Sequence, residues 1–312
     1  MDTQTDIVRA MRGASPALEL HLGRSIFATG GQLSGVVLFR MAKPTNIRSL
    51  VVSVAGCEAV VGTSFARSAH KPISFFQRDV LLSGRDRPRF RPELISRFWN
   101  EFLGRDNGRL LSAGEHMYPF SILLPASLPP TYQGISGRID YTLTARIEFP
   151  LGYSMQVSKA IPVAYVPRSQ KSRPVSMSYP SSDGALPPGS ISINVELLQR
   201  CVELGQRITG RFVIANPRRV EIKEIVASLE NCEWVRGDTQ KETGRSVAQS
   251  MVIEPEDPVA GFIEGRFELR VPENAVPTVE GAAISVMWFL KLYLNSPHPM
   301  EFKAPITVYM PQ

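Results

Sequence analysis

The sequence predicts an all-β fold made of two tandem β-sandwich domains. Three observations support this prediction: an internal duplication, apolar residues that alternate with polar ones, and turn residues spread along the chain. The 312 residues include 25 Pro and 23 Gly, and 43% are hydrophobic. A chain of this length can form two domains that each bury a core. Frequent Pro and Gly suit short strands joined by turns.

The duplication is clearest when the sequence is displaced by 175 residues, because Gly30–Val60 then lies on Gly205–Val235 without a gap. The apolar strand before it aligns as well. A repeat of this kind indicates two copies of one structural unit. The matched positions are Gly30 with Gly205, Gly35 with Gly210, Ile47 with Ile222, Val51 with Val226, Ser53 with Ser228, Cys57 with Cys232, Glu58 with Glu233, Val60 with Val235, and Leu18, Leu20 and Leu22 with Ile193, Val195 and Leu197.

The second half of each unit aligns at a shorter displacement. Phe120–Pro125 resembles Phe267–Pro272, and a Pro-Thr pair follows in both units, at Pro130 and at Pro277. The alternating runs Ile139–Phe149 and Ile284–Leu294 come next, at a displacement of roughly 145 residues. The displacement shrinks because the first unit carries extra sequence between about Gly62 and Gly114.

Apolar residues alternate with a period of two in both units, as in Leu50/Val52/Val54 and Ile139/Tyr141/Leu143. This period places one face of a strand on a core and the other toward solvent. A single sheet cannot bury its apolar face alone, so each unit is expected to be a sandwich. We expect an N-terminal domain over 15–168, a linker rich in Ser and Pro over 169–189, and a C-terminal domain over 190–312.

The extra sequence of the first unit predicts one short amphipathic helix on the N-terminal domain, over 92–103. Pro92 and Gly104 are typical helix boundaries. The helix either caps the first sandwich or contacts a membrane or a partner, since basic residues precede it. Its apolar face is formed by Leu94, Ile95, Phe98, Trp99 and Phe102, and the preceding cluster consists of Arg85, Arg87, Arg89 and Arg91.

The segment Gly114–Ala145 resembles the arrestin superfamily. The family pattern is matched by Gly114, Tyr118, Phe120, Leu124-Pro125, Leu128-Pro129, Thr131-Tyr132, Gly134, Gly137, Ile139, Tyr141 and Leu143. The resemblance extends over about residues 15–312 and includes the α-arrestins and, as a close second, the arrestin-like subunit of retromer. It implies two immunoglobulin-like sandwiches and a scaffold that binds membrane receptors, cargo, trafficking or signalling proteins, or ubiquitin ligases without catalysis.

The same resemblance directs attention to particular residues. The loop Ser64–Ser74 resembles the central-crest loop of arrestins, and it contains Arg67 and Lys71. After the first strand the chain has Arg24 but no Lys-Lys pair, so the phosphate sensing of receptor arrestins is unsupported. Pro129–Tyr132 matches the Pro-Pro-x-Tyr ligand of WW domains, but it falls inside the expected fold and is interpreted as structural.

Charge and motifs narrow the function. Residues 1–170 hold 20 Lys and Arg against 12 Asp and Glu, a net charge of +8, whereas residues 171–312 hold 15 against 17. We therefore expect partners to bind a basic surface formed by Arg24, Arg67, Lys71, Arg85, Arg87, Arg89 and Arg91. The alternative is a peripheral membrane-binding protein that uses the Arg85–Arg91 cluster and the 92–103 helix.

Other function classes lack a sequence signal. The His and Cys residues show no metal-binding spacing, and no nucleophile elbow or phosphate-binding loop occurs. We expect no catalytic, cofactor or metal-binding residues, and no nucleic-acid partner, because no binding motif accompanies the basic charge. Three dispersed cysteines, expected to be buried thiols, and the lack of a long apolar run favour a cytoplasmic protein, with peripheral membrane association left open.

Overall fold

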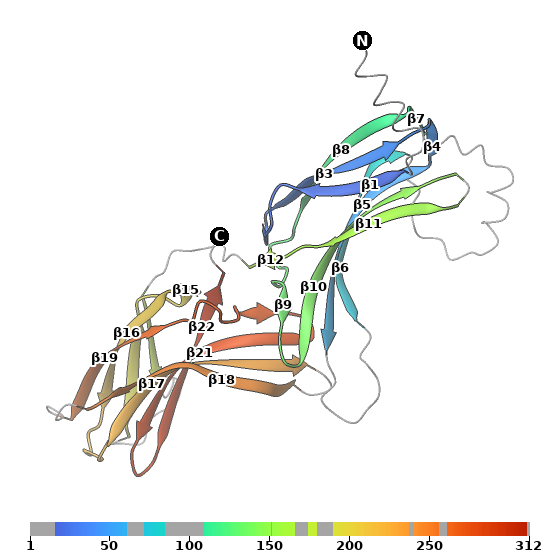
Figure 1. The fold of residues 1–312 in the computed structure, drawn as a ribbon. Helices are drawn as coiled ribbons and strands as arrows, with labels where there is room; N and C mark the ends of the chain where they lie inside the picture. Colours follow the sequence, from blue (N-terminus) through green and yellow to red (C-terminus); the bar gives the residue numbers. More distant parts are fainter. Residues whose placement is uncertain are drawn as a thin grey trace. The chain divides into compact units, whose positions relative to one another are not determined.

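The computed structural model describes residues 16–60, 72–84, 109–150, 152–165, 174–179, 190–236, 240–255 and 261–310. Within these ranges every regular secondary-structure element is a β-strand. The described residues contain no membrane-spanning helix. The predicted all-β fold of two sandwiches is confirmed (Figure 1). The helix predicted over 92–103 lies outside the described residues.

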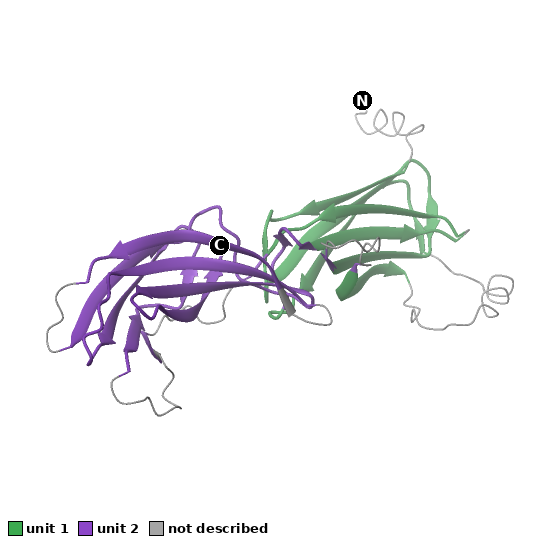
Figure 2. Ribbon diagram, turned by 90° about the horizontal axis from the view of Figure 1, so that it is seen from below, with its two compact units in different colours: residues 1–57, 73–127, 140–163 green, residues 58–72, 128–139, 164–312 purple. Residues whose placement is uncertain are grey.

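Unit 1 comprises residues 1–57, 73–127 and 140–163 (Figure 2). The strands of the first half form two main sheets. One has the order β1 (Ala17–Leu22), β3 (Gln32–Met41), β8 (Gly114–Leu123). The other has the order β11 (Ser154–Ala160), β10 (Gly137–Glu148), β5 (Ser49–Val60), β6 (Ile73–Gly84), and β9 (Tyr132–Gln133) pairs with β10. Two short pairs complete this half: β2 (Phe27–Ala28) with β12 (Val163–Ala164), and β4 (Thr45–Ile47) with β7 (Arg109–Leu111).

Unit 2 comprises residues 58–72, 128–139 and 164–312. Its first sheet has the order β13 (Val175–Tyr179), β14 (Ser192–Leu197), β16 (Arg207–Ala215), β19 (Phe262–Arg270). The second has the order β15 (Cys201–Glu203), β22 (Met300–Tyr309), β21 (Ile284–Asn295), β17 (Glu224–Arg236), β18 (Gln240–Ile253), and β20 (Val279–Glu280) pairs with β21. Strand β13 lies inside the stretch expected to be a linker, and it pairs with β14 as an edge strand.

The central strand orders of the first half reappear in the second half, as the duplication predicts, with β13 and β15 added at the sheet edges. The order β1-β3-β8 reappears as β14-β16-β19, and β11-β10-β5-β6 reappears as β22-β21-β17-β18. Ile139 pairs with Tyr132 of β9 as Val286 pairs with Val279 of β20, so equivalent positions here are 147 residues apart, as for Phe120 and Phe267.

The alternating apolar residues form the cores. In β10 the side chains of Ile139, Tyr141 and Leu143 are buried while those between them are exposed. In β21 every second residue from Ile284 to Leu294 is buried, with Trp288 fully enclosed. Burial of these apolar faces is the main favourable contribution to folding.

Two equivalent glycines leave room for an aromatic ring from the neighbouring strand to pack over them. Gly35 of β3 lies opposite Phe120 of β8, and Gly210 of β16 lies opposite Phe267 of β19. A Cβ atom on Gly35 would lie 2.8 Å from the Phe120 ring, and one on Gly210 would lie 2.8 Å from the Glu196 carbonyl oxygen while also contacting the Phe267 ring. Both distances are shorter than van der Waals contact allows, so the repeat keeps glycine at both positions.

The expectation of three buried thiols was wrong for two of them. Cys232 is buried, whereas Cys57 and Cys201 are half-buried, and all three are free. In β5 the neighbours Gly56 and Glu58 are buried, so Cys57 lies on the opposite, outward-facing side of the strand.

We predict that Gly210→Ala lowers the free energy of unfolding by about 1–3 kcal/mol, because the added methyl group overpacks the strand against Phe267. Gly35→Ala should behave similarly. Gly23→Ala is the matched control, since a Cβ atom there meets nothing within 4 Å. Urea denaturation followed by tryptophan fluorescence measures the three variants; equal losses for Gly23→Ala and Gly210→Ala would contradict the steric explanation.

Candidate functional site

Of the basic residues predicted to bind partners, the structure describes Arg24, which is exposed in the turn between β1 and β2. Arg67, Lys71 and the cluster Arg85, Arg87, Arg89 and Arg91 lie outside the described residues. The same holds for the predicted helix side chains Leu94, Ile95, Phe98, Trp99 and Phe102. Among the described residues, the most extensive buried polar site lies in unit 2, around the glutamates Glu58 and Glu233.

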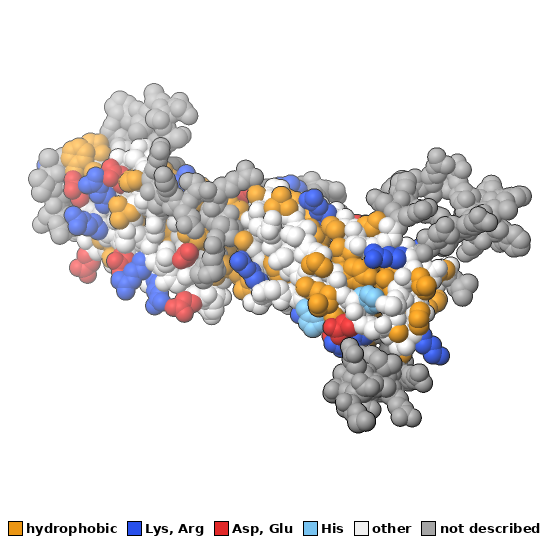
Figure 3. Space-filling view, turned by 90° about the horizontal axis from the view of Figure 1, so that it is seen from above, with side chains coloured by type: hydrophobic (Ala, Val, Ile, Leu, Met, Phe, Trp, Pro, Cys, Tyr) orange, Lys and Arg blue, Asp and Glu red, His pale blue; other side chains and the backbone are white. Residues whose placement is uncertain are grey.

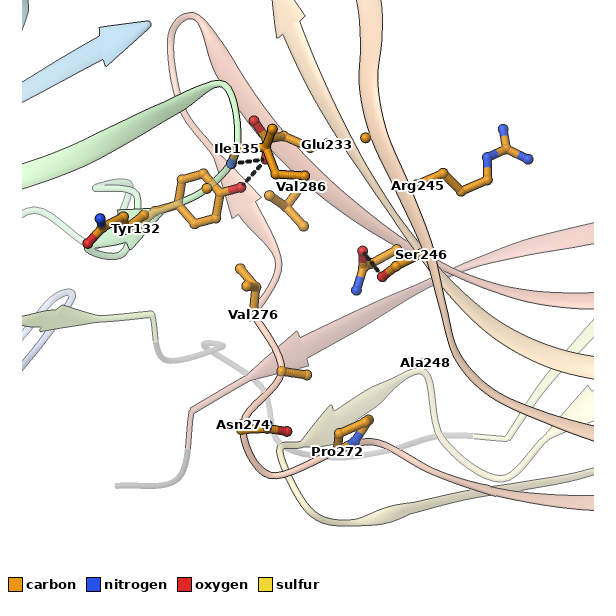
Figure 4. Close-up of a pocket in the computed structure, with 15 residues that line it drawn as sticks. Tyr132, Ile135, Glu233, Arg245, Ser246, Ala248, Pro272, Asn274, Val276 and Val286 are labelled. Carbon is orange, nitrogen blue, oxygen red and sulfur yellow. Dashed lines mark hydrogen bonds between the residues drawn. The ribbon is translucent and has the colours of Figure 1, made fainter. Parts of the chain in front are cut away.

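Glu233 of β17 is a buried carboxylate with three hydrogen-bond donors around it. The Tyr132 hydroxyl donates to it at 2.6 Å, and the backbone N–H groups of Ile135 and Ser136 donate at 3.0 and 2.7 Å. Figure 4 shows Tyr132 and Ile135 directed at Glu233 from the β9–β10 turn. All these residues belong to unit 2.

Glu58 of β5, the residue equivalent to Glu233 in the repeat, makes the complementary contact. Its carboxylate is completely buried and accepts hydrogen bonds from the N–H groups of Ala282 at 2.8 Å and Ala283 at 3.0 Å, and also from that of Ile284. These residues form the β20–β21 turn, which is the counterpart of the β9–β10 turn. Both turns are closed by one backbone bond, Gly134 N–H to the Gly137 carbonyl and Gly281 N–H to the Ile284 carbonyl. Each glutamate therefore binds the turn that belongs to the other copy of the repeat.

This arrangement solves the problem of burying charge without a metal or a basic side chain. A buried carboxylate is costly unless it is hydrogen-bonded, and several backbone N–H donors can stabilise its charged form. Burial, together with the hydrogen bond to Glu233, raises the pKa of Tyr132 well above its ordinary value, so Tyr132 remains a donor. Among the described residues no group of three or more His, Cys, Asp or Glu could hold a metal ion.

A cavity of about 470 Å³ opens beside Glu233, within unit 2 (Figure 4). Its walls come from the β9–β10 turn, from β17, β18 and β21, and from the loop that follows β19. The lining residues include Tyr132, Ile135, Asn231, Glu233, Gly244, Arg245, Ser246, Ala248, Pro272, Asn274, Val276 and Val286.

The opposite side of β17 and β18 carries charged residues that bind one another. Arg245 donates two hydrogen bonds to Glu242, at 2.8 and 2.9 Å, and these raise the pKa of Arg245. The buried carboxylate of Glu230 lies 3.2 Å from the Lys291 ammonium group. In Figure 4 the Arg245 side chain points away from the cavity, so its charge is used by this cluster.

Comparison with known proteins identifies the family. The N-terminal domain model of arrestin (or S-antigen) matches residues 18–166, and the C-terminal domain model matches residues 187–312. Together the two matches cover both sandwiches. The chain therefore belongs to the arrestin superfamily, in agreement with the strand order described above.

Several curated proteins are similar to parts of the chain. Arrestin domain-containing protein 17 of Caenorhabditis elegans is 28% identical over 137 residues, which cover 44% of this chain and 31% of the relative. The HECT-type ubiquitin ligase-interacting protein apyA of Emericella nidulans is 29% identical over 188 residues, or 59% of this chain and 46% of the relative. Human arrestin domain-containing protein 1 is 26% identical over 133 residues, or 43% and 25%. The chain thus matches less than half the length of each of these three relatives.

This site was partly predictable from the amino-acid sequence. Glu58 and Glu233 were matched by the duplication, and each is a charged residue within an apolar strand, which is unusual unless the charge is paired. The turns that they bind could not be found, because 97 to 226 residues separate each glutamate from its donors. Pro129 and Pro130 are buried and Tyr132 is bound to Glu233, so the Pro-Pro-x-Tyr segment lies inside the fold, as expected.

We predict that Tyr132→Phe lowers the free energy of unfolding at about pH 7 by about 1.5–3 kcal/mol, the contribution of a hydrogen bond to a charged group. Because the pKa of Tyr132 is raised in the folded protein, its contribution is complete below the unfolded pKa of about 10 and is lost as the pH rises further. The difference in free energy of unfolding between the wild type and Tyr132→Phe should therefore become smaller above about pH 10. Urea denaturation at about pH 7 and above about pH 10 measures this difference. A difference that grows with pH would contradict the assignment.

Proposed function

We propose that this protein is a non-enzymatic adaptor that holds membrane receptors or cargo, or trafficking and signalling proteins, through protein–protein contacts. Membership of the arrestin superfamily across both halves is the observation that supports this function most strongly. Binding function resides in surfaces rather than in the fold, so the contact residues need their own argument.

A ubiquitin ligase is one class of partner that the comparisons suggest. The relative apyA carries the name of a HECT-type ubiquitin ligase-interacting protein, and the aligned part covers 59% of this chain. In this chain the segment Pro129–Tyr132 is a poor candidate for such a contact. Its two prolines are buried and its tyrosine hydroxyl donates to Glu233, so a WW domain could reach it only after unit 2 opened locally.

The first half of the chain is the better candidate for an anionic partner. Residues 1–170 carry a net charge of +8, and the C-terminal 142 residues carry −2. On the face shown in Figure 3, positive and negative side chains of unit 2 are intermixed, and along β19 the exposed residues run Glu264, Arg266, Glu268, Arg270. The proposed contact residues are Arg24, Arg67, Lys71, Arg85, Arg87, Arg89 and Arg91, because arginine pairs well with carboxylate and phosphate groups.

We predict that reversing the charge of Arg85, Arg87, Arg89 and Arg91 together, each to Glu, reduces partner recovery by about tenfold or more. The assay is affinity capture of the full chain from a detergent extract of membranes, followed by mass spectrometry. A control with the same charge change, Arg109, Arg219, Arg236 and Arg266 each to Glu, uses four exposed arginines spread over the surface.

Recovery of no membrane or trafficking protein, or equal losses for the two variants, would contradict the proposal. Co-sedimentation with vesicles of phosphatidylcholine and phosphatidylserine at low and high salt distinguishes the membrane alternative. Salt-sensitive binding to vesicles without any protein partner would favour a peripheral membrane protein instead.

A further inference from the structure

Strand β18 is a long edge strand with an unpaired side. It has 14 residues, and among the described residues the only strand that pairs with it is β17. Val247, Met251 and Val252 are exposed on it. An edge strand presents a row of free N–H and C=O groups, which is a template for another strand. The pairing of β18 with β17 shifts register between Leu229 and Glu230 and between Glu233 and Trp234. Such bulges interrupt an edge, and the segment Gly244–Val247 between them pairs regularly with β17, so it is the part of the edge best suited to pair with a partner strand.

Four residues of β18, Gly244, Arg245, Ser246 and Ala248, line the cavity beside Glu233. At one end of the opening, the Gln249 side chain accepts a hydrogen bond from the Arg270 N–H and joins β18 to the end of β19. Beyond this link, Ser246 and Ala248 lie on one wall and Pro272 and Asn274 on the other (Figure 4). Ile135, which is 74% exposed, lies near Gly244 at the other end. The edge and the cavity therefore form one slot along Gly244–Ala248.

The slot favours an aliphatic side chain, because its acidic and hydroxyl groups are already hydrogen-bonded within the protein. The Glu233 carboxylate is already bound by three donors, and the Asn231 amide oxygen accepts the Ser246 hydroxyl. Arg245 is bound to Glu242 on the other side of the strand. The remaining lining is mostly aliphatic, including Ala248, Val276 and Val286. A volume of about 470 Å³ lies within the usual range of binding pockets, about 300–1,000 Å³.

We propose that an extended peptide segment of a partner protein adds to β18 along Gly244–Ala248 and places an aliphatic side chain in the cavity. Backbone hydrogen bonds to the free edge supply affinity, and the cavity selects the side chain. Only another strand can pair with the row of backbone donors and acceptors, and the Glu233, Arg245 and Ser246 side chains that line the cavity are already bound within the protein. The proposal deepens the adaptor function and rests on it only in taking the partner to be a protein.

The test uses the purified full chain and a phage-displayed library of random linear peptides. The selected peptides should share an aliphatic residue flanked by residues other than proline, because proline cannot donate to the ladder. Ala248→Phe, which fills the cavity, should weaken binding of the synthesised peptides by at least about tenfold in fluorescence polarisation. Leu198→Phe is the matched control, because Leu198 is an exposed aliphatic residue of unit 2 that lies neither on β18 nor in the cavity lining; it should change affinity by less than about twofold.

Failure to enrich any peptide, or equal affinity for the two variants, would overturn the proposal. Thermal unfolding checks that both variants are folded, and Ser246→Arg replaces Ala248→Phe if the latter does not fold. Sedimentation velocity tests for a second copy of the chain: a dimer lost in Ala248→Phe would assign the edge to self-association and overturn the peptide assignment. The peptide selection and the affinity capture from membrane extract are independent experiments. A failed selection would therefore overturn the peptide-binding proposal without contradicting the adaptor function.

Discussion

Five backbone N–H groups in unit 2, those of Ile135, Ser136 and Ala282–Ile284, find their acceptors on two glutamate side chains. A buried N–H group without an acceptor costs about 1–3 kcal/mol, so the two turns depend on Glu233 and Glu58. The exchange is reciprocal, since each copy of the repeat supplies the carboxylate for the turn of the other. Glu58 and the β9–β10 turn come from the first half of the sequence but belong to unit 2.

The elements of the fold were predictable wherever local rules apply. The alternation of apolar residues identified the inward faces of β10 and β21. The 175-residue displacement matched the segments that form β3 and β16, and those that form β5 and β17, from the sequence alone. The roles of Glu58 and Glu233 were not predictable, because a hydrogen bond between Glu58 and Ile284 spans 226 residues and leaves no periodic signal. The cavity and the slot were unpredictable for the same reason, because their walls come from five separate segments of the chain.

The two proposed contact surfaces differ in chemistry. The basic residues of the first half offer charge, which acts over several ångströms and controls association rates and salt dependence. The slot along β18 offers backbone pairing and a largely aliphatic cavity, which act at contact distance and select a shape. An adaptor with both features can attract an anionic partner with one surface and recognise an extended segment with the other. The buried Glu233 belongs to the second surface, because its carboxylate lines the cavity and is held there by three donors.

The most direct test of this account is the stability of Glu58→Ala and Glu233→Ala compared with Glu196→Ala, whose carboxylate forms an exposed ion pair with Arg211. Substitution of either buried glutamate should lower the free energy of unfolding by at least about 3 kcal/mol, because two or three buried donors are then left without an acceptor. Glu196→Ala should change it by less than about 1 kcal/mol. Urea denaturation supplies all three values. If removal of either buried glutamate costs no more than removal of Glu196, the exchange of carboxylates does not hold this structure together.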